Sequence, residues 1–356
     1  MNKDRSESQR CQLSEQRRKV DFDTYDVSVD ELLRRIMSHR INAAPVYQRQ
    51  FRWDLDRQSK LIESVLLGIP IPPLFMATNT SSDATSTWEV VDGLQRLFSL
   101  VNFLADRKTK TELGLSDQPL ALQGLEKLSS FNNSTFDDLP EDLKSTLQDR
   151  PIKVIVLNDK SEIRVRFDLF ERLNTGGISL TNQEIRSCIF RGEFNDLLGE
   201  LASTTNFKKV VVLSKGKEKD GTPEEFVLRF FAFYQNYNLF DHSVKDFLDD
   251  FMENASKKPL IDKRRELFMR TFNYLSSCFS NGIKSHKGTT PVNLFEGISV
   301  GAALALERMD YKINPIKYDW TKSIILRQMI GSATNSRKRV VGRIEYCRDI
   351  FLEKNV

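Results

Sequence analysis

The stretch VVDGLQR, from Val90 to Arg96, decides the fold of the N-terminal half. Its apolar start predicts a buried strand, the pair Asp92-Gly93 predicts a sharp turn, and the apolar spacing that follows predicts a helix. Such a turn directs backbone amides and the positive end of the helix dipole at one point, which suits an anion such as phosphate. Gly93 permits a ligand to approach the backbone closely. Arg96 can place its guanidinium on phosphate oxygens.

Asp92 has two interpretations at this turn. It could hold a magnesium ion. Alternatively, it could cap the helix of an ordinary strand–turn–helix unit, in which Arg96 is a solvated charge. The sequence alone leaves both interpretations open.

The elements around this stretch predict an α+β fold, in which a small mixed sheet with helices is followed by an all-helical second half. Strands are expected at residues 41–47, 74–77, 88–91 and 152–157, and helices after the caps Ser28, Asp54 and Thr181 and at residues 163–173. Beyond residue 192 the apolar period is helical almost throughout. We therefore expect a flexible polar tail at 1–20, a first domain at 21–191 with an irregular insertion near 107–150, and a helical domain at 192–356.

The composition is that of an ordinary globular protein. The 356 residues are 40% hydrophobic and 29% charged, with a net charge of +4 that permits contact with nucleic acid without requiring it. The chain has no run of about 18 apolar residues and no secretory leader, so a cytoplasmic protein without a membrane span is expected. Four widely spaced cysteines and three histidines argue against a zinc site and predict buried free thiols.

A second segment combines aromatic and polar residues. PVYQRQFRW, from Pro45 to Trp53, interleaves two arginines and two glutamines with three aromatic rings. Aromatic and basic residues in alternation fit the stacking of nucleobases. The alternative is an amphipathic edge strand with its basic residues in solvent. We expect Gln48 and Arg49 of this segment to line the same cavity as Asp92 and Arg96.

A third segment, FERLNTGG, runs from Phe170 to Gly177. Glu171 and Asn174 stand three residues apart on one helical face, a spacing that can share a metal ion or a ribose phosphate. The alternative is an ordinary helix end at which Asn174 caps the helix and Glu171 pairs with a neighbouring base. A helix C-terminus carries partial negative charge, so any nucleotide contact here would pass through a cation.

Together, PVYQRQFRW, a strand that ends in DGLQR, and FERLNTGGISLTNQEIR resemble the N-terminal domain of GmrSD-type, modification-dependent restriction proteins. The resemblance implies a fold related to ParB and sulfiredoxin, in which a strand–turn–helix with a terminal arginine cradles nucleotide phosphates. It also assigns Glu171, Arg172 and Asn174 to a phosphate and metal segment. The usual family motif is Asp-Gly-Gln-Gln-Arg, and this chain departs from it with Leu94 at the first Gln position. The histidine spacing of a C-terminal His-Asn-His nuclease is missing, so nuclease activity of its own is not expected.

The resemblance implies a component of a DNA-directed restriction or anti-phage defence system that binds Mg²⁺ and hydrolyses a nucleoside triphosphate. In that role Asp92, Gln95 and Arg96 would be catalytic and Asp92 and Glu171 would hold the metal. Gln48, Arg49, Gly93, Arg172, Asn174 and Gly176 would bind the nucleotide. The alternative is a ParB-like DNA sensor, or an adaptor, that recruits a nuclease partner without hydrolysis. DNA is the expected partner in each case, and a homo-oligomer is left open.

Clusters of basic residues and a phenylalanine-rich segment lead to two further predictions. The basic clusters Arg17-Arg18-Lys19 and Arg337-Lys338-Arg339, the latter followed by Arg343 and Arg348, could contact the DNA backbone or be solvated surface charge. The phenylalanines between Phe226 and Phe233 are expected to form the core of the helical domain.

Overall fold

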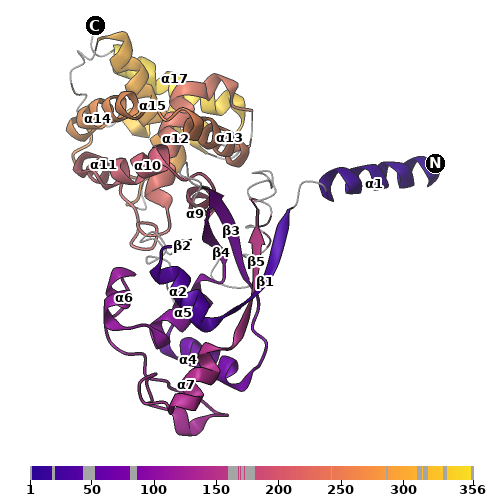
Figure 1. The fold of residues 1–356 in the computed structure, drawn as a ribbon. Coiled ribbons are helices and arrows are strands. Elements are labelled where there is room, and N and C mark those ends of the chain that lie inside the picture. The colour runs from indigo at the N-terminus through magenta and orange to yellow at the C-terminus, as the bar shows by residue number, and fades with distance from the viewer. Residues whose placement is uncertain are drawn as a thin grey trace. The chain divides into compact units, whose positions relative to one another are not determined.

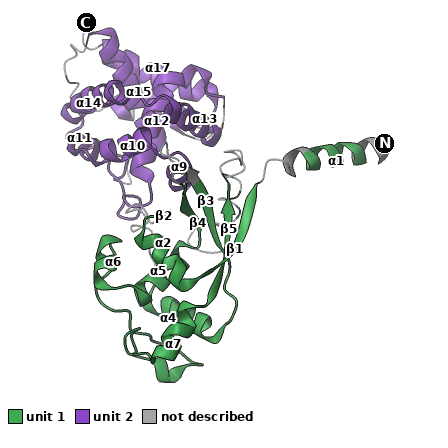
Figure 2. Ribbon diagram, viewed as in Figure 1, with its two compact units in different colours: residues 1–179 green, residues 180–356 purple. Residues whose placement is uncertain are grey.

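The computed structural model describes residues 2–17, 21–42, 53–80, 86–158, 167, 169, 172, 181–241, 243–285, 288–310, 315, 320–331 and 335–353. The chain divides into two compact units, Met1–Ser179 and Leu180–Val356 (Figure 2). The first is built on a mixed sheet and the second on helices, so the predicted α+β class is confirmed. Within the described ranges, no helix is both long and apolar enough to cross a membrane.

The first unit combines a five-stranded sheet with short helices (Figure 1). Its strands are β1 (Phe22–Ser28), β2 (Ile41–Asn42), β3 (Leu74–Thr80), β4 (Ser86–Asp92) and β5 (Pro151–Leu157). Its helices are α1 (Asn2–Arg17), α2 (Val29–Met37), α4 (Leu55–Leu67), α5 (Leu94–Leu104), α6 (Arg107–Glu112) and α7 (Glu141–Gln148), with the 3₁₀ turn η1 (Ser129–Phe131). The strand order is β1-β5-β3-β4-β2, in which β1–β5 and β3–β4 are antiparallel and β3–β5 and β2–β4 are parallel.

The apolar pattern of the central strands explains the core of this unit. Leu74 and Met76 of β3 and Val154 of β5 are completely buried, and Val90 of β4 is nearly so. Helix α5 follows β4 directly and buries Leu97 to Leu104 without interruption. Burial of this apolar surface is the main favourable contribution to the folding of the unit.

Several local expectations are confirmed and others are wrong. Asp54 and Ser28 cap α4 and α2 as predicted, but the Glu31 carboxylate pairs with Arg34 and Arg35 instead of completing a capping box. Residues 2–17, part of the segment predicted to be a flexible polar tail, form helix α1. Strand β1 was not predicted from its sequence. Of the segment expected at 41–47, Ile41 and Asn42 form β2 and the rest lies outside the described residues.

The segment near 107–150, predicted to be an irregular insertion, has little regular structure between α6 and α7, and it is packed. It contains α6, η1 and α7, and it buries Leu122 and Leu147 completely. The Glu63 carboxylate of α4 accepts hydrogen bonds from the backbone amides of Lys127 and Leu128, at 3.0 and 2.9 Å. Such backbone contacts satisfy polar groups in segments that have no regular ladder.

The second unit is helical (Figure 1). Its helices are α9 (Asn182–Ile189), α10 (Glu193–Ser203), α11 (Thr205–Val210), α12 (Thr222–Asn236), α13 (Val244–Lys257), α14 (Ile261–Cys278), α15 (Val292–Arg308), α16 (Ile324–Ile330) and α17 (Arg337–Glu353), with the 3₁₀ turns η3 (Tyr237–Leu239) and η4 (Trp320–Lys322). Thr181 caps α9 in a capping box with Glu184, as predicted.

Phenylalanines and the helical glycine Gly301 organise the core of this unit. Phe230 of α12 is fully buried and contacts Phe268 and Phe272 of α14 at ring-centroid distances of 5.5 and 5.7 Å, which confirms the predicted core role. Helices α15 and α17 approach closely because Gly301 lacks a side chain. A Cβ at that position would lie 2.7 Å from the backbone nitrogen of Arg348.

Candidate functional site

The turn between β4 and α5 requires glycine. Gly93 adopts the left-handed region with a φ of 95°, which residues other than glycine rarely do. A Cβ on Gly93 would lie 2.5 Å from Cδ2 of Leu74 and 2.9 Å from Nη2 of Arg96. The chain therefore turns at Gly93 under two constraints, one from the backbone and one from packing.

Gly93, and not Asp92, occupies the N-cap position of α5. The cap makes no side-chain hydrogen bond to the first turn within the part of the chain that the structure describes. Amides of a first helical turn have no intrahelical acceptor, and the helix dipole adds positive potential at the same place. The alternative in which Asp92 caps this helix is thus wrong, and the first turn of α5 can accept an anion.

Arg96 lies across this turn and is only 15% exposed. Its Nη2 donates to Oδ2 of Asp92 at 2.7 Å and to the backbone carbonyl of Pro73 at 3.2 Å. Its Nε is buried and has no hydrogen-bond partner in the described residues. Arg96 is therefore not a solvated charge, and a buried donor that lacks a partner costs free energy until an acceptor reaches it.

Gln95 ties the turn to the start of α4. Its Oε1 accepts a hydrogen bond of 3.0 Å from the backbone amide of Trp53. The carbonyl of Trp53 accepts from Nε2 of Gln58 at 3.0 Å, and Oε1 of Gln58 accepts from Nδ2 of Asn102 at 2.9 Å. This chain of polar contacts fixes the orientation of Gln95 and connects α5 with Trp53, the last residue of the segment Pro45–Trp53.

Several residues predicted for the site lie outside the described residues. These are Gln48, Arg49, Glu171, Asn174 and Gly176. Arg172 is described and exposed. The structure brings Asp92, Gly93, Gln95 and Arg96 together on one turn. Glu89 of β4 was not singled out from the sequence; it is 4% exposed and makes contacts of its own, although no contact places it at this turn among the described residues. Its position as an acidic residue within an apolar strand could have indicated its burial from the sequence.

The residues of the turn fit a phosphate better than they fit a metal ion by themselves. An uncapped helix N-terminus and a buried guanidinium are donors only, which suits phosphate oxygens. Asp92 is the acidic residue of this turn. In the described ranges no group of three or more His, Cys, Asp and Glu residues could hold a metal ion. A magnesium ion at this turn would therefore need phosphate oxygens among its ligands, which is its usual way of binding beside one or two carboxylates.

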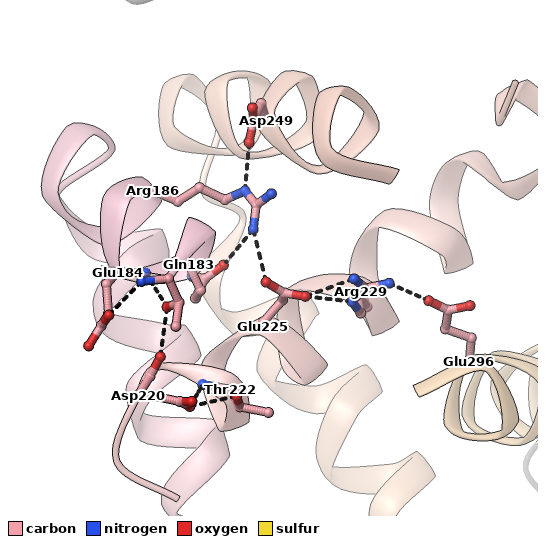
Figure 3. Close-up of polar contacts among 10 residues, drawn as sticks. Gln183, Glu184, Arg186, Asp220, Thr222, Glu225, Arg229, Asp249 and Glu296 are labelled. Carbon is pink, nitrogen blue, oxygen red and sulfur yellow. Dashed lines mark hydrogen bonds and ion pairs between the residues drawn. The ribbon is translucent and has the colours of Figure 1, made fainter. Parts of the chain in front are cut away.

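A second polar cluster lies within the second unit (Figure 3). Arg186 of α9, 1% exposed, donates from Nε to Asp249 of α13 at 2.6 Å and from Nη1 to Glu225 of α12 at 3.2 Å. Arg229 then joins Glu225, at 2.7 Å, to Glu296 of α15, at 2.6 Å. Arg343 of α17 pairs with the same Glu296, so three arginines and three carboxylates alternate through five helices.

The pKa values in this cluster differ because burial and charge compete. Burial raises the pKa of Glu225, but the guanidinium groups of Arg229 and Arg186 outweigh it and lower the pKa below its usual value. At Asp249 burial prevails over Arg186, and the pKa is raised. Arg186 ends the motif ISLTNQEIR, and its burial among carboxylates indicates a structural role. Removing one partner of a buried pair leaves an uncompensated charge, which typically costs about 3–5 kcal/mol.

Several basic residues of α17 have partners within the protein, whereas Lys338 is exposed. Arg343 is completely buried with Glu296. Arg348 pairs with Asp349 at 2.7 Å, and Arg337 donates to the backbone carbonyl of Asn238 at 2.6 Å. The thiol prediction is confirmed for Cys188 and Cys347, which are buried, and is wrong for the exposed Cys11.

A glycine at a left-handed position before a helix N-terminus, with an arginine folded over it, is an arrangement whose donors suit an anion. Residues 31–191 match the family described as the GmrSD restriction endonuclease N-terminal domain. The match indicates involvement in a restriction system and interaction with DNA. No curated protein matches the chain significantly.

Proposed function

We propose that the β4–α5 turn binds the phosphates of a nucleoside triphosphate and that the protein hydrolyses this nucleotide as part of a restriction system. The observation that carries the proposal is the conjunction of two groups of donors. The first turn of α5 has no side-chain cap, and the Arg96 Nε beside it is buried with no partner among the described residues. A phosphate oxygen supplies the acceptor that both groups lack.

The residues of the turn have distinct roles in this proposal. Gly93 allows the phosphate to reach the backbone amides without meeting a side chain. Asp92 orients Arg96 through the 2.7 Å ion pair, so the guanidinium is held in place before the nucleotide arrives. A positioned positive charge stabilises the negative charge that develops during phosphoryl transfer.

The metal in this proposal follows from the family resemblance and from the charge of a triphosphate. Asp92 and Glu171 would hold a magnesium ion, which neutralises phosphate charge and can lower the pKa of a bound water. Gln48, Arg49, Arg172, Asn174 and Gly176 complete the proposed nucleotide site. Support for the segment around Arg49 comes from Trp53, whose amide is hydrogen-bonded to Gln95.

A second candidate function, a nucleotide-dependent switch without hydrolysis, is favoured by the position of Gln95. Its carbonyl oxygen is engaged by the Trp53 amide, so this residue joins the turn to α4 as well as facing the site. A ligand that shifts α5 would move the start of α4 through this bond, which gives a route from nucleotide to conformation. In this case the protein recruits a nuclease partner while its nucleotide stays intact.

Release of inorganic phosphate, measured with and without duplex DNA, separates the two functions. We expect the wild-type protein to release phosphate from a triphosphate in the presence of Mg²⁺, and Arg96→Ala to release it at least tenfold more slowly. Arg34→Ala is the matched control, because Arg34 is 66% exposed on α2 and has only surface carboxylates as partners. Tight nucleotide binding without any phosphate release under either condition would replace hydrolysis with the switch. Absence of binding would refute both functions.

A further inference from the structure

Two segments of the second unit, residues 204–221 and 279–291, are joined to each other. The backbone amide of Ile283 donates to the carbonyl of Val210 at 2.8 Å, and the amide of Thr290 donates to the carbonyl of Val212 at 2.9 Å. The amide of Val212 in turn donates to Oγ1 of Thr290 at 2.9 Å. These bonds hold two stretches that are far apart in the sequence next to each other.

Close packing makes this junction stiff. Gly282 has a φ of 81°, and a Cβ there would lie 2.6 Å from Cγ2 of Val212 and 3.2 Å from the carbonyl oxygen of Lys209. Ile283 is 1% exposed beside it. Side chains that project from this junction are therefore held on a fixed base.

These two segments contain the entire positive excess of the chain. Residues 204–221 have five lysines against two acidic residues, and residues 279–291 have two lysines and no acidic residue. Their combined formal charge is +5, whereas the whole chain has +4, so all other residues together carry −1. The chain therefore contains a strongly basic region although its net charge is small.

Six of the seven lysines in these two segments lie in the described residues. We call Lys208, Lys209, Lys215, Lys217, Lys219 and Lys284 the lysine surface; all six are exposed, and none forms an ion pair in the part of the chain that the structure describes. Two other surface bases of the same unit do pair: Lys257 with Glu253 at 2.6 Å, and Arg265 with Glu200 at 2.8 Å. Asp220, within the first segment, is occupied with Thr222.

We propose that the lysine surface binds the phosphate backbone of duplex DNA. Unpaired ammonium groups on a fixed base neutralise phosphates and release their counterions, which drives binding to any sequence. Lysine acts as a point charge and does not fork onto base edges as arginine does, so this surface positions DNA without reading its sequence.

An acidic protein is a poorer fit to the same surface. The centre of a protein–protein interface is enriched in aromatic residues and methionine and depleted in lysine. The exposed large hydrophobic residues found in the described ranges all lie outside both segments. The surface offers charge without an apolar centre, which is the character of a nucleic-acid backbone contact.

The proposed DNA contact does not depend on the nucleotide site, and the experiment measures DNA binding and nucleotide binding separately. Fluorescence anisotropy of a labelled duplex of mixed sequence is measured against wild type and against a triple variant with Lys215→Ala, Lys217→Ala and Lys284→Ala. Salt is varied between about 50 and 200 mM. The matched control replaces Lys257, Arg265 and Arg270, three cations paired on the same unit, and removes the same formal charge. Nucleotide affinity and thermal unfolding are recorded for each protein.

We expect the triple lysine variant to bind DNA at least tenfold more weakly than the wild type at 100 mM salt. The slope of log K against log salt should shrink by about 0.9 for each lysine that contacts a phosphate. The paired-cation variant should keep the wild-type slope, and both should keep nucleotide affinity. Equal weakening in the two triple variants, an unchanged slope in the lysine variant, or a wild type that binds an acidic polypeptide but not duplex DNA would overturn the proposal.

Discussion

Replacing Gly93 with alanine tests whether the β4–α5 turn is built as described. The substitution adds one methyl group at a backbone position with a φ of 95°. That group would lie 2.5 Å from Leu74 Cδ2 in the core and 2.9 Å from Arg96 Nη2. Since both neighbours are packed, the turn or the sheet must shift to make room.

Two contributions set the expected loss of stability. A non-glycine residue in the left-handed region costs about 1–2 kcal/mol, and overpacking a filled core typically costs a further 1–3 kcal/mol. We therefore expect the free energy of unfolding of the first unit to fall by about 2–5 kcal/mol. For a unit that spans Met1–Ser179, a loss of about 3 kcal/mol lowers the melting temperature by roughly 6–12 °C.

Gly124→Ala separates the two contributions. Gly124 lies in the same unit with a φ of 65°, and its nearest neighbour, Oδ1 of Asp56, is at an ordinary 3.5 Å. We expect this variant to lose only the backbone contribution, about 1–2 kcal/mol. The assay is thermal unfolding followed by tryptophan fluorescence, because Trp53 and Trp88 both lie in the first unit. A Gly93→Ala protein that melts at the wild-type temperature, or no lower than Gly124→Ala, would refute the described packing at the turn.

The remaining predictions concern one buried carboxylate and the proposed metal ligands. The pKa of Glu225 is lowered in the folded protein from 4.5, because Arg229 and Arg186 outweigh burial; its stabilising contribution is complete above that value and is lost as the pH falls through the folded pKa. Glu225→Gln should therefore be less stable at pH 7 and lose stability less steeply below about pH 4.5 in urea denaturation, and identical pH profiles would contradict this. Glu171→Gln and Asn174→Ala should each weaken the magnesium dependence of nucleotide affinity; unchanged magnesium titrations in both would leave them as structural residues.

Local apolar patterns in the sequence predicted most strands of the sheet. They did not predict the strand that lacks an apolar face. The runs around Val90 and Val154 are apolar because both faces of the central strands are covered, and they were recognised. Strand β1 has five exposed residues before Val27, so its sequence lacks an alternating pattern. Its stability comes from antiparallel pairing with β5, including the Lys153–Asp26 contact at 3.0 Å, which sequence spacing does not reveal.

Within the site, only contacts between residues about one helical turn apart could be predicted from the sequence. Asp92 and Arg96 are four residues apart, so their proximity follows from the helix that begins between them. The hydrogen bond from Trp53 to Gln95 spans 42 residues and depends on how α4 packs against α5. The burial of Arg186 likewise depends on carboxylates far away in the sequence, of which Asp249 is 63 residues distant. Because of such long-range ion pairs, charged residues that the sequence suggests are exposed to solvent can be buried and structural.

The most direct test of the central claim is the affinity of the first unit's turn for a nucleotide. Isothermal titration of each common triphosphate, with Mg²⁺, is carried out on the full chain in its wild-type, Arg96→Ala and Arg34→Ala forms. Loss of a charge-assisted contact costs about 1.5–3 kcal/mol, so Arg96→Ala should bind roughly 10- to 150-fold more weakly, while Arg34→Ala should match the wild type. A folded Arg96→Ala protein with wild-type affinity would contradict the assignment of the phosphate site to this turn.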